Sequence, residues 1–209
     1  MRKPLGILIA SIVLLGLVPA HSGAVTMKTT RFVGYFEGYL SCVYADPAGH
    51  ATIGYGHLLH YGAPTKKDRK KWGCLTKLQA LKLLKKDLQA TEDEVLSRLE
   101  GAAISPSILT ALDSFAFNLG AGALDHTPKQ GRARATDIAL HVRQGKYRKA
   151  GREMLLFDGI IVGGKRIELE GLRIRRRAEY DLMVKGITEP KTCDGNCKSN
   201  TNPGGLGPG

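Results

Sequence analysis

The sequence predicts an α+β fold in which a small β-containing lobe is followed by a larger helical lobe. Short apolar runs separated by turn residues lie between residues 40 and 60, whereas apolar residues recur at helical spacing from residue 77 onward. The segment after residues 1–24 is about 185 residues long, which is enough for one domain with its own core. We therefore expect a single catalytic domain over residues 25–188.

The first 24 residues have the three regions of an export signal. Arg2 and Lys3 precede an apolar stretch from Leu5 to Val18, and two small-x-small sites follow, Ala20-His21-Ser22 and Ser22-Gly23-Ala24. The apolar stretch has about 14 residues, fewer than the roughly 20 that cross a bilayer as a helix. We expect residues 1–24 to be cleaved near residue 22 or 24 and the protein to be exported to the periplasm or cell envelope.

The segment from residue 32 to residue 38 places a carboxylate at a helix end. Phe32–Glu37 has the composition of the last part of a short helix, and Gly38 suits the left-handed position beyond it. The helix dipole disfavours a negative charge there, and burial against Phe32 or Phe36 would act in the same direction. We therefore expect Glu37 to retain its proton readily, as a general acid must.

A turn follows and brings a second carboxylate toward a hydroxyl. Asp46-Pro47-Ala48-Gly49 has the residue preferences of a type I turn, which would reverse the chain between Val43-Tyr44 and Ala51–Ile53. This reversal would place Asp46 near Thr52. Glycosidic hydrolysis commonly needs one carboxylic acid and a second carboxylate. Singly, each of these residues is usually structural, but their combination favours an active site.

The spacing of these residues resembles that of the phage-type lysozymes, the endolysins of glycoside hydrolase family 24. In this family a Glu-Gly pair, a Tyr-x-Asp nine positions after the Glu, and a Thr-Ile-Gly-x-Gly-His run six positions after the Asp form the active site. Glu37, Asp46 and Thr52 occupy these positions here. The resemblance extends over residues 28–188, with departures at Phe157 and Glu170, where Trp and Pro are common. Its further motifs are Ala111–Gly120, Gly163-Gly164-Lys165, Gly171-Leu172 and Arg175–Glu179.

The resemblance implies a phage-lysozyme-like fold and a muramidase that cleaves the β-1,4 bond between N-acetylmuramic acid and N-acetylglucosamine in peptidoglycan. Glu37 would donate the proton, while Asp46 and Thr52 would orient and activate a water on the opposite face of the sugar, with inversion. No metal or organic cofactor is expected, because acid, base and water suffice. Candidate substrate-binding residues are Tyr55, His57 and Asn118, with a structural hydrogen bond as the alternative for His57.

Three alternatives remain open at this stage. A lytic transglycosylase uses a single acid/base, so Asp46 and Thr52 argue against it. A cationic protein could instead disrupt the envelope without hydrolysis. The apolar N-terminal segment could also be a signal-arrest-release anchor, which tethers the enzyme to the membrane before release, although such anchors are typically richer in Gly and Ala.

The four cysteines form an even set in a chain that we expect to be exported, where disulfides are permitted. Of the three complete pairings we prefer Cys42–Cys74 with Cys193–Cys197, because one pair then lies in the enzyme domain and the other in the tail. A buried thiol at Cys42 is the alternative. A zinc site is not expected, because Cys193 and Cys197 have no histidine or second cysteine pair at ligand spacing.

The net charge of +12, or +10 without Arg2 and Lys3, fits an anionic partner such as the bacterial envelope. We interpret the basic run Lys66–Lys71 as a solvated loop, with contact to anionic wall or membrane as the alternative. The arginines of residues 173–177 are interpreted as surface and ion-pair residues, and no motif indicates nucleic-acid binding. A monomer is expected. Residues 189–209, rich in Pro, Asn and Gly, are expected to be a tail.

Helices are predicted from capping residues and apolar spacing. A capping box at Thr76–Gln79 begins the long interlobe helix, and Ser105-Pro106 begins the next, which Gly120 ends. The expected inner faces are Leu78, Leu81, Leu84, Leu88, Val95 and Leu99 in the first, and Ile108, Leu112, Phe115 and Leu119 in the second. Later helices are expected at residues 136–144, 147–157 and 172–183.

Overall fold

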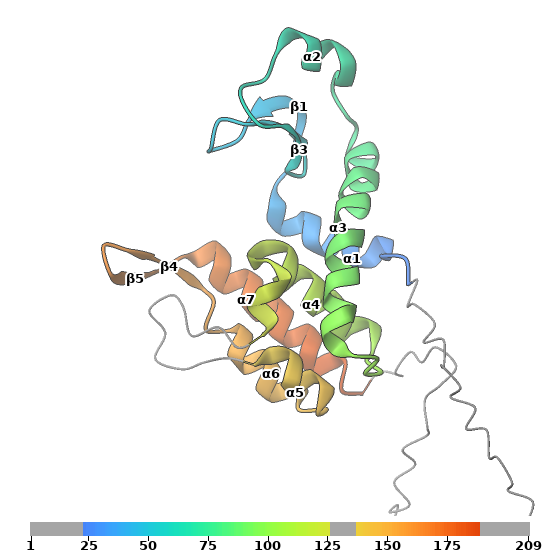
Figure 1. The fold of residues 1–209 in the computed structure, drawn as a ribbon, viewed down its shortest axis with the longest axis vertical. Coiled ribbons are helices and arrows are strands. Elements are labelled where there is room, and N and C mark those ends of the chain that lie inside the picture. Colours follow the sequence, from blue (N-terminus) through green and yellow to red (C-terminus); the bar gives the residue numbers. More distant parts are fainter. Residues whose placement is uncertain (1–22, 126–136, 189–209) are drawn as a thin grey trace, which may run out of the picture.

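The computed structural model describes residues 23–125 and 137–188. It has two lobes, as predicted (Figure 1). Three short strands and one short helix form the small lobe at one end of the molecule, and a group of packed helices forms the larger lobe. A single long helix, α3, runs from one lobe to the other. Residues 1–22 of the expected signal segment and the expected tail lie outside the described residues.

One helix precedes the strands of the small lobe, and most of the helices follow them. The elements are α1 (Met27–Glu37), β1 (Leu40–Ala45), β2 (Ala51–Gly54), β3 (His57–His60), α2 (Lys66–Trp72), α3 (Lys77–Leu99), α4 (Pro106–Leu119), a 3-10 turn (Ala121–Leu124), α5 (Ile138–Arg143), α6 (Tyr147–Met154), β4 (Gly159–Val162), β5 (Lys165–Glu168) and α7 (Glu170–Lys185).

The small lobe is built on an antiparallel sheet in the order β1-β2-β3. The predicted reversal at Asp46 is confirmed, because the Gly49 amide donates to the Asp46 carbonyl at 2.8 Å. Tyr44 consequently pairs with Thr52 across the two strands. The hairpin thus fixes which residues of β1 and β2 stand opposite one another.

The basic run Lys66–Lys71, predicted to be a loop, is instead helical and forms most of α2. Thr65 and Asp68 explain this difference. The Thr65 hydroxyl accepts from the Asp68 amide, and the Asp68 carboxylate accepts from the Thr65 amide, so two free amides of the first turn are satisfied. Gly73, with φ of 59°, ends the helix. The prediction overlooked this capping box because the charges dominated the pattern.

The predicted disulfide between Cys42 and Cys74 is present. It joins β1 to the segment between α2 and α3, where the two cysteines also form an isolated β-bridge. The second predicted pair, Cys193–Cys197, lies outside the described residues. The observed bond closes a loop that contains β2, β3, α2 and most of β1, so it holds the small lobe against the start of α3.

The long helix α3 begins at the predicted capping box, where Thr76 and Gln79 bond one another's backbone amides. Leu84 and Leu88 pack with Val25 and Val33 beneath the small lobe, whereas Val95 and Leu99 enter the main core of the helical lobe. Leu78, predicted to face inward, is exposed because it lies in the first turn of the helix. The same helix therefore contributes to two apolar clusters.

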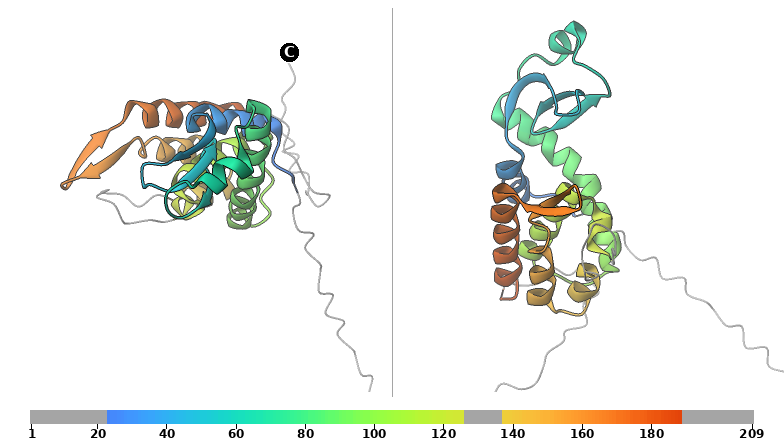
Figure 2. Two further views of the ribbon diagram at one scale, coloured as in Figure 1. Left: turned by 90° about the horizontal axis from the view of Figure 1, so that it is seen from above. Right: turned by 90° about the vertical axis from the view of Figure 1, so that its left-hand side faces the viewer.

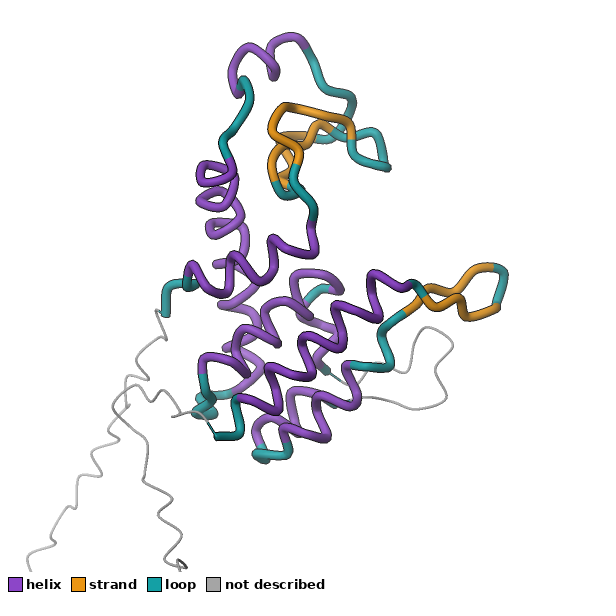
Figure 3. The backbone as a smooth tube through the Cα atoms, turned by 180° about the vertical axis from the view of Figure 1, so that it is seen from behind, coloured by secondary structure: helices purple, strands orange, loops and turns teal. Residues whose placement is uncertain are grey.

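The helical lobe packs around α4, which contacts α3, α7 and α1. Ile108, Leu112 and Phe115 are fully buried, as predicted, whereas Leu119 is exposed in the last turn. Helix α7 packs against α4, α6 packs against α7, and α5 packs against α6. Figure 3 shows the helices of this lobe packed together. Within residues 23–125 and 137–188, the helices are either too short or too polar to cross a bilayer.

A two-stranded hairpin, β4–β5, projects from the helical lobe just before α7 (Figure 2). The sequence analysis did not predict it, because apolar residues in its four-residue strands do not alternate with polar ones and all but Gly159 are exposed. A Cβ atom at Gly159 would lie 2.3 Å from the Ile167 carbonyl oxygen. Glycine is therefore required where β4 meets β5.

Replacement of Cys74 by serine should lower the free energy of unfolding by about 2–4 kcal/mol, because the crosslink restricts the unfolded chain across a separation of 32 residues. Urea unfolding of the wild type and the variant measures this difference. The reduced wild type should behave as the variant does. Equal midpoints for the oxidised wild type and Cys74→Ser would contradict the prediction.

Candidate active site

Glu37 is the last residue of α1, and its carboxyl group faces a cleft of about 600 Å³. Gly38 follows with φ of 71° and ψ of 161°, so the expected positive φ is present but the left-handed helical conformation is not. The Glu37 side chain is 22 % exposed. The cleft is lined by Tyr35, Phe36, Glu37, Asn118, Leu169, Gly171, Leu172, Ile174 and Arg175. Glu37 is the single carboxylate in this lining.

Arg175 on α7 holds the Glu37 carboxylate. Its Nη1 donates to Glu37 Oε1 at 2.7 Å, and its Nη2 donates to the Ser114 carbonyl at 2.8 Å. The guanidinium carbon also lies 5.4 Å from the centre of the Phe36 ring. Arg175 forms the ion pairs that were predicted for these arginines, but it is only 3 % exposed, so its placement on the surface was wrong. The sequence-based prediction for Glu37 considered the helix end and the nearby aromatic rings, but not a positively charged partner such as Arg175.

A second buried ion pair supports Arg175. Glu179, one turn further along α7, lies 2.7 Å from Arg176 Nε and 3.3 Å from Arg175 Nε, and accepts a hydrogen bond from the Ser114 hydroxyl at 2.7 Å. Burial raises the pKa of Glu179 and lowers the pKa of Arg176, and the attraction between the two opposes both effects. Arg176 is thus also buried, contrary to the sequence-based interpretation.

Asp46 and Thr52 are held by the hairpin on the opposite lobe. Asp46 Oδ1 accepts from the Ala48 amide at 2.9 Å and from the His50 amide at 2.8 Å. The Thr52 hydroxyl donates to the His50 carbonyl at 3.1 Å, and Thr52 is nearly buried. His50 therefore connects the two side chains through its backbone, as the predicted reversal requires. These bonds fix the position of Asp46 independently of any substrate.

Tyr44 connects the two candidate carboxylates electrostatically. Burial raises the pKa of the Tyr44 phenol, and the negative charges of Asp46 and then Glu37 raise it further. Both carboxylates therefore act on one side chain between the lobes. Tyr44 is the tyrosine of the Tyr-x-Asp motif, and its position two residues before Asp46 was the sequence signal for this role.

The three candidate substrate-binding residues differ in position. Asn118 lines the cleft, and its Oδ1 accepts from Arg176 at 3.1 Å. Tyr55 packs against Tyr39 and against the apolar cluster that contains Val33 and Leu84. It is not part of the cleft lining beside Glu37. His57 is likewise absent from that lining. The structure thus brings Asn118 to Glu37 but not the other two.

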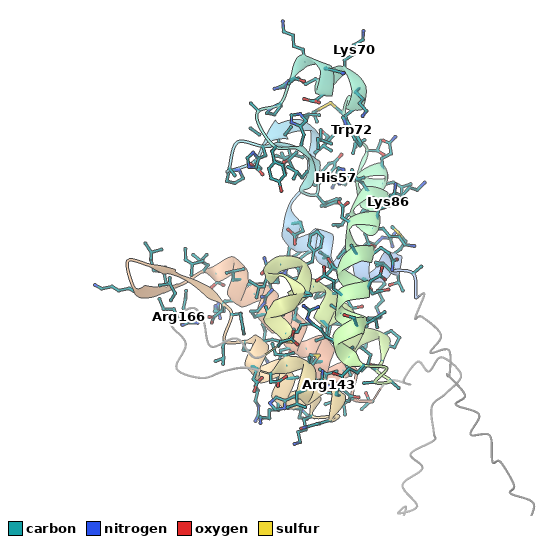
Figure 4. The ribbon with its side chains drawn as sticks, viewed as in Figure 1. His57, Lys70, Trp72, Lys86, Arg143 and Arg166 are labelled. Carbon is teal, nitrogen blue, oxygen red and sulfur yellow. A yellow bond between two sulfur atoms is a disulfide. The ribbon has the colours of Figure 1, made fainter. Side chains whose placement is uncertain are left out.

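His57 joins the small lobe to α3. Its Nδ1 lies 2.9 Å from Asp87 Oδ2, and its ring lies 5.9 Å from the Trp72 ring. Figure 4 shows His57 and Trp72 together in the small lobe. This geometry is that of the structural hydrogen bond considered as the alternative for His57.

The arrangement can perform acid-assisted hydrolysis. Glu37 places a carboxyl group at an open cleft, and a carboxylic acid in that position can protonate a leaving oxygen. Asp46 and Thr52 are held on the hairpin by His50 and, like Tyr55 and His57, are absent from the cleft lining. A model of the phage lysozyme family matches residues 34–179, well over half of the chain. The chain belongs to the phage lysozyme family.

Individual relatives agree with this assignment. The chain is 32 % identical over 177 residues to an endolysin of Bacillus phage B103, and the match covers 80 % of this chain. It spans 58 % of the length of that endolysin. Among solved structures, an endolysin from Escherichia coli O157:H7 phage FAHEc1 is 26 % identical with a TM-score of 0.60, covering 78 % of this chain and 94 % of that one.

A mutant of P22 lysozyme has the same fold at 23 % identity and a TM-score of 0.56, covering 77 % of this chain and 97 % of that one. These matches confirm the predicted phage-lysozyme-like α+β fold. They also agree with the two-lobed arrangement described above.

Replacement of Arg175 by glutamine should reduce both activity and stability in this phage lysozyme homologue. Loss of one partner of a buried ion pair leaves Glu37 without its guanidinium and Glu179 with Arg176 alone, which costs about 3–5 kcal/mol. Urea unfolding and turbidity of a peptidoglycan suspension measure the two effects. Arg177→Gln is the matched control, since Arg177 is exposed on the same helix. Equal losses in the two variants would contradict a special role for Arg175.

Proposed function

We propose that the protein is a muramidase that cleaves the β-1,4 bond between N-acetylmuramic acid and N-acetylglucosamine in peptidoglycan. The observation that supports this most strongly is the position of Glu37, a partly exposed carboxyl group at the cleft, oriented by a buried arginine from the other end of the chain. The family assignment and the endolysin relatives are consistent with it. Peptidoglycan is the corresponding substrate, acted on by a monomer.

In this proposal Glu37 protonates the leaving glycosidic oxygen. Asp46, whose carboxylate is fixed by two backbone amides, and Thr52 orient and activate a water on the opposite face of the sugar. Asn118 hydrogen-bonds the sugar from the cleft wall. The expected outcome is inversion of configuration, which requires room for a water between the two carboxyl groups.

Export is the second part of the proposal. The Cys42–Cys74 disulfide supports it, because such bonds persist in oxidising compartments. Residues 1–24 would direct the chain across the inner membrane, by cleavage or by later release of a tethered form. The periplasm or cell envelope would then be the place where the enzyme meets its substrate.

Mass analysis of released fragments tests the reaction. The full chain, exported under its own N-terminal segment, is incubated with purified peptidoglycan beside Glu37→Gln and the matched control Glu94→Gln, which changes an exposed glutamate on α3. Fragments with reducing muramic ends are expected from the wild type and the control, and a loss of at least 100-fold in Glu37→Gln. Near-normal release by Glu37→Gln would show that Glu37 is not the acid.

The ends of the fragments also decide between the enzyme classes. Anhydro-muramic ends would identify a lytic transglycosylase. Absence of fragments, combined with permeabilisation of cells that survives Glu37→Gln, would identify a cationic envelope-disrupting protein. Both results would contradict the muramidase proposal.

A specific observation favours additional contact with an anionic envelope surface. Helix α2 stands at the far end of the small lobe, where Lys70 points away from the molecule (Figure 4). Lys66, Lys67, Lys70 and the other cations of the helix are exposed. Its single carboxylate, Asp68, is already bonded to His60 and Thr65. Helix α2 therefore presents positive charge at the end of the small lobe, because it has too few carboxylates of its own to neutralise its lysines.

Replacement of Lys66, Lys67 and Lys70 by glutamine should weaken binding to vesicles that contain phosphatidylglycerol by roughly 100-fold, because each lysine near an anionic surface contributes a several-fold factor. Co-sedimentation at low salt measures the binding. A variant with the same change of charge elsewhere, at Lys82, Lys86 and Lys149, is the control, since these lysines are also exposed. Equal weakening in both variants would refute a special role for α2.

A further inference from the structure

Two carboxyl groups are buried side by side where α3, α4 and the start of the described chain meet. Glu92 on α3 is 3 % exposed, and Asp113 on α4 is 0 % exposed. Neither oxygen of Asp113 receives a hydrogen bond from a donor within the described residues. The Glu92 carboxyl is the charged neighbour that acts on Asp113, and two carboxyl groups can bond one another only through a shared proton. Nothing in the proposed hydrolysis uses this pair.

Within residues 23–125 and 137–188, no lysine or arginine forms an ion pair with either carboxyl. Burial raises the pKa of Asp113 well above its ordinary range, and the negative charge of Glu92 raises it further. Burial likewise raises the pKa of Glu92, while the other charges acting on it are those of Asp93 and Lys85 on the same helix. Ionisation of both carboxyls without a partner would therefore be costly.

The N-terminal segment lies against this pair. A Cβ atom placed on Gly23 would lie 3.8 Å from Glu92 Oε1. Gln89, one turn before Glu92, fixes the segment from both sides: its Nε2 donates to the Gly23 carbonyl at 3.3 Å, and its Oε1 accepts from the Val25 amide at 3.2 Å. Val25 is fully buried beyond it. Gly23 is thus held within reach of the Glu92 carboxyl.

We infer that the Glu92–Asp113 pair is a binding site for a primary ammonium group, namely the α-amino group that cleavage after Ser22 creates at Gly23. Ser22 ends the small-x-small site Ala20-His21-Ser22. This inference rests on the proposed export. In the uncut chain the nitrogen of Gly23 is a neutral amide and cannot neutralise the pair.

Cleavage changes the charge at this point by simple hydrolysis. Water breaks the Ser22–Gly23 peptide bond, its hydroxyl group completes the Ser22 carboxyl, and its hydrogen goes to the Gly23 nitrogen. The new amine then takes a proton from solvent, because its ordinary pKa is about 7.7–8.0. The resulting ammonium can pair with one carboxylate. Its three N–H donors replace the single N–H of the amide.

The consequence for the enzyme is a link between processing and the rigidity of α1. The segment from Gly23 leads directly into α1, whose Thr29 hydroxyl bonds the Thr110 hydroxyl of α4 at 2.9 Å and whose last residue is Glu37. An ammonium bound at Glu92 and Asp113 would attach the start of α1 to both α3 and α4. Processing would thereby stabilise the helix that carries the proposed acid.

The stability of the two forms should also differ in its dependence on pH. Because the folded pKa values of the two carboxyls are raised, their contribution is present at low pH and is lost as the pH rises through those values. In the processed chain the ammonium favours ionised carboxylates, which lowers their folded pKa values and makes this loss smaller. The difference between the forms ends when the amine itself loses its proton.

The test uses the full chain, exported and recovered from the periplasm. Intact-mass analysis identifies the first residue, and competitive labelling with acetic anhydride measures the pKa of its α-amino group. We expect Gly23 as the first residue. Its amine at pH 7 should react roughly ten-fold more slowly in the wild type than in Glu92→Gln/Asp113→Asn, as a difference of one in pKa implies. The double variant keeps the shape of the pair and removes both charges.

Glu94→Gln/Glu100→Gln is the matched control, because both glutamates are exposed and the change in charge is the same. It should label as the wild type does. If the double variant does not fold, the single variant Asp113→Asn gives the same comparison. A different first residue, or equal labelling of the wild type and the variants, would overturn the inference. Labelling does not depend on turnover, so failure of the muramidase proposal is recognised separately in the fragment assay.

Discussion

The contact between Glu37 and Arg175 is the interaction on which the site depends, because it joins the end of α1 to the start of α7 across 138 residues of sequence. Removing a guanidinium from water is expensive, and the surrounding groups offset that cost. Arg175 donates to Ser114 as well as to Glu37, and Glu179 supplies a second negative charge. The carboxyl group is therefore held by a network that extends into the core of the helical lobe.

The two sides of the site are fixed by different parts of the molecule. Glu37 belongs to the helical lobe through Arg175, whereas Asp46 and Thr52 belong to the hairpin of the small lobe. The position of the small lobe relative to the helical lobe depends on α3, on the Cys42–Cys74 bond and on the contact between His57 and Asp87. These contacts do not touch the cleft lining, yet they set where the hairpin stands relative to Glu37. Mobility between lobes would act mainly on the distance between the two carboxylates.

Sequence alone predicted the parts of the structure whose signals are local. The turn at Asp46, the capping box at Thr76 and the apolar periodicity of α3 and α4 each involve residues within a few positions of one another. Arg175 could not be distinguished in this way from Arg173 or Arg177, because burial depends on what packs against α7. The hairpin β4–β5 was missed for a related reason, since its exposed strands lack alternation. Tyr44 lies two residues before Asp46 in the sequence, but only the structure shows that the charges of Asp46 and Glu37 both act on its phenol.

A double-mutant cycle between Glu37 and Arg175 tests the central claim most directly. Values of kcat/KM on soluble peptidoglycan fragments would be measured for the wild type, Arg175→Gln, Glu37→Gln and the double variant. If Arg175 acts by holding Glu37, its replacement reduces kcat/KM in the wild type and causes no further loss in Glu37→Gln. Equal losses in the two backgrounds would contradict the account, because Arg175 would then act independently of Glu37.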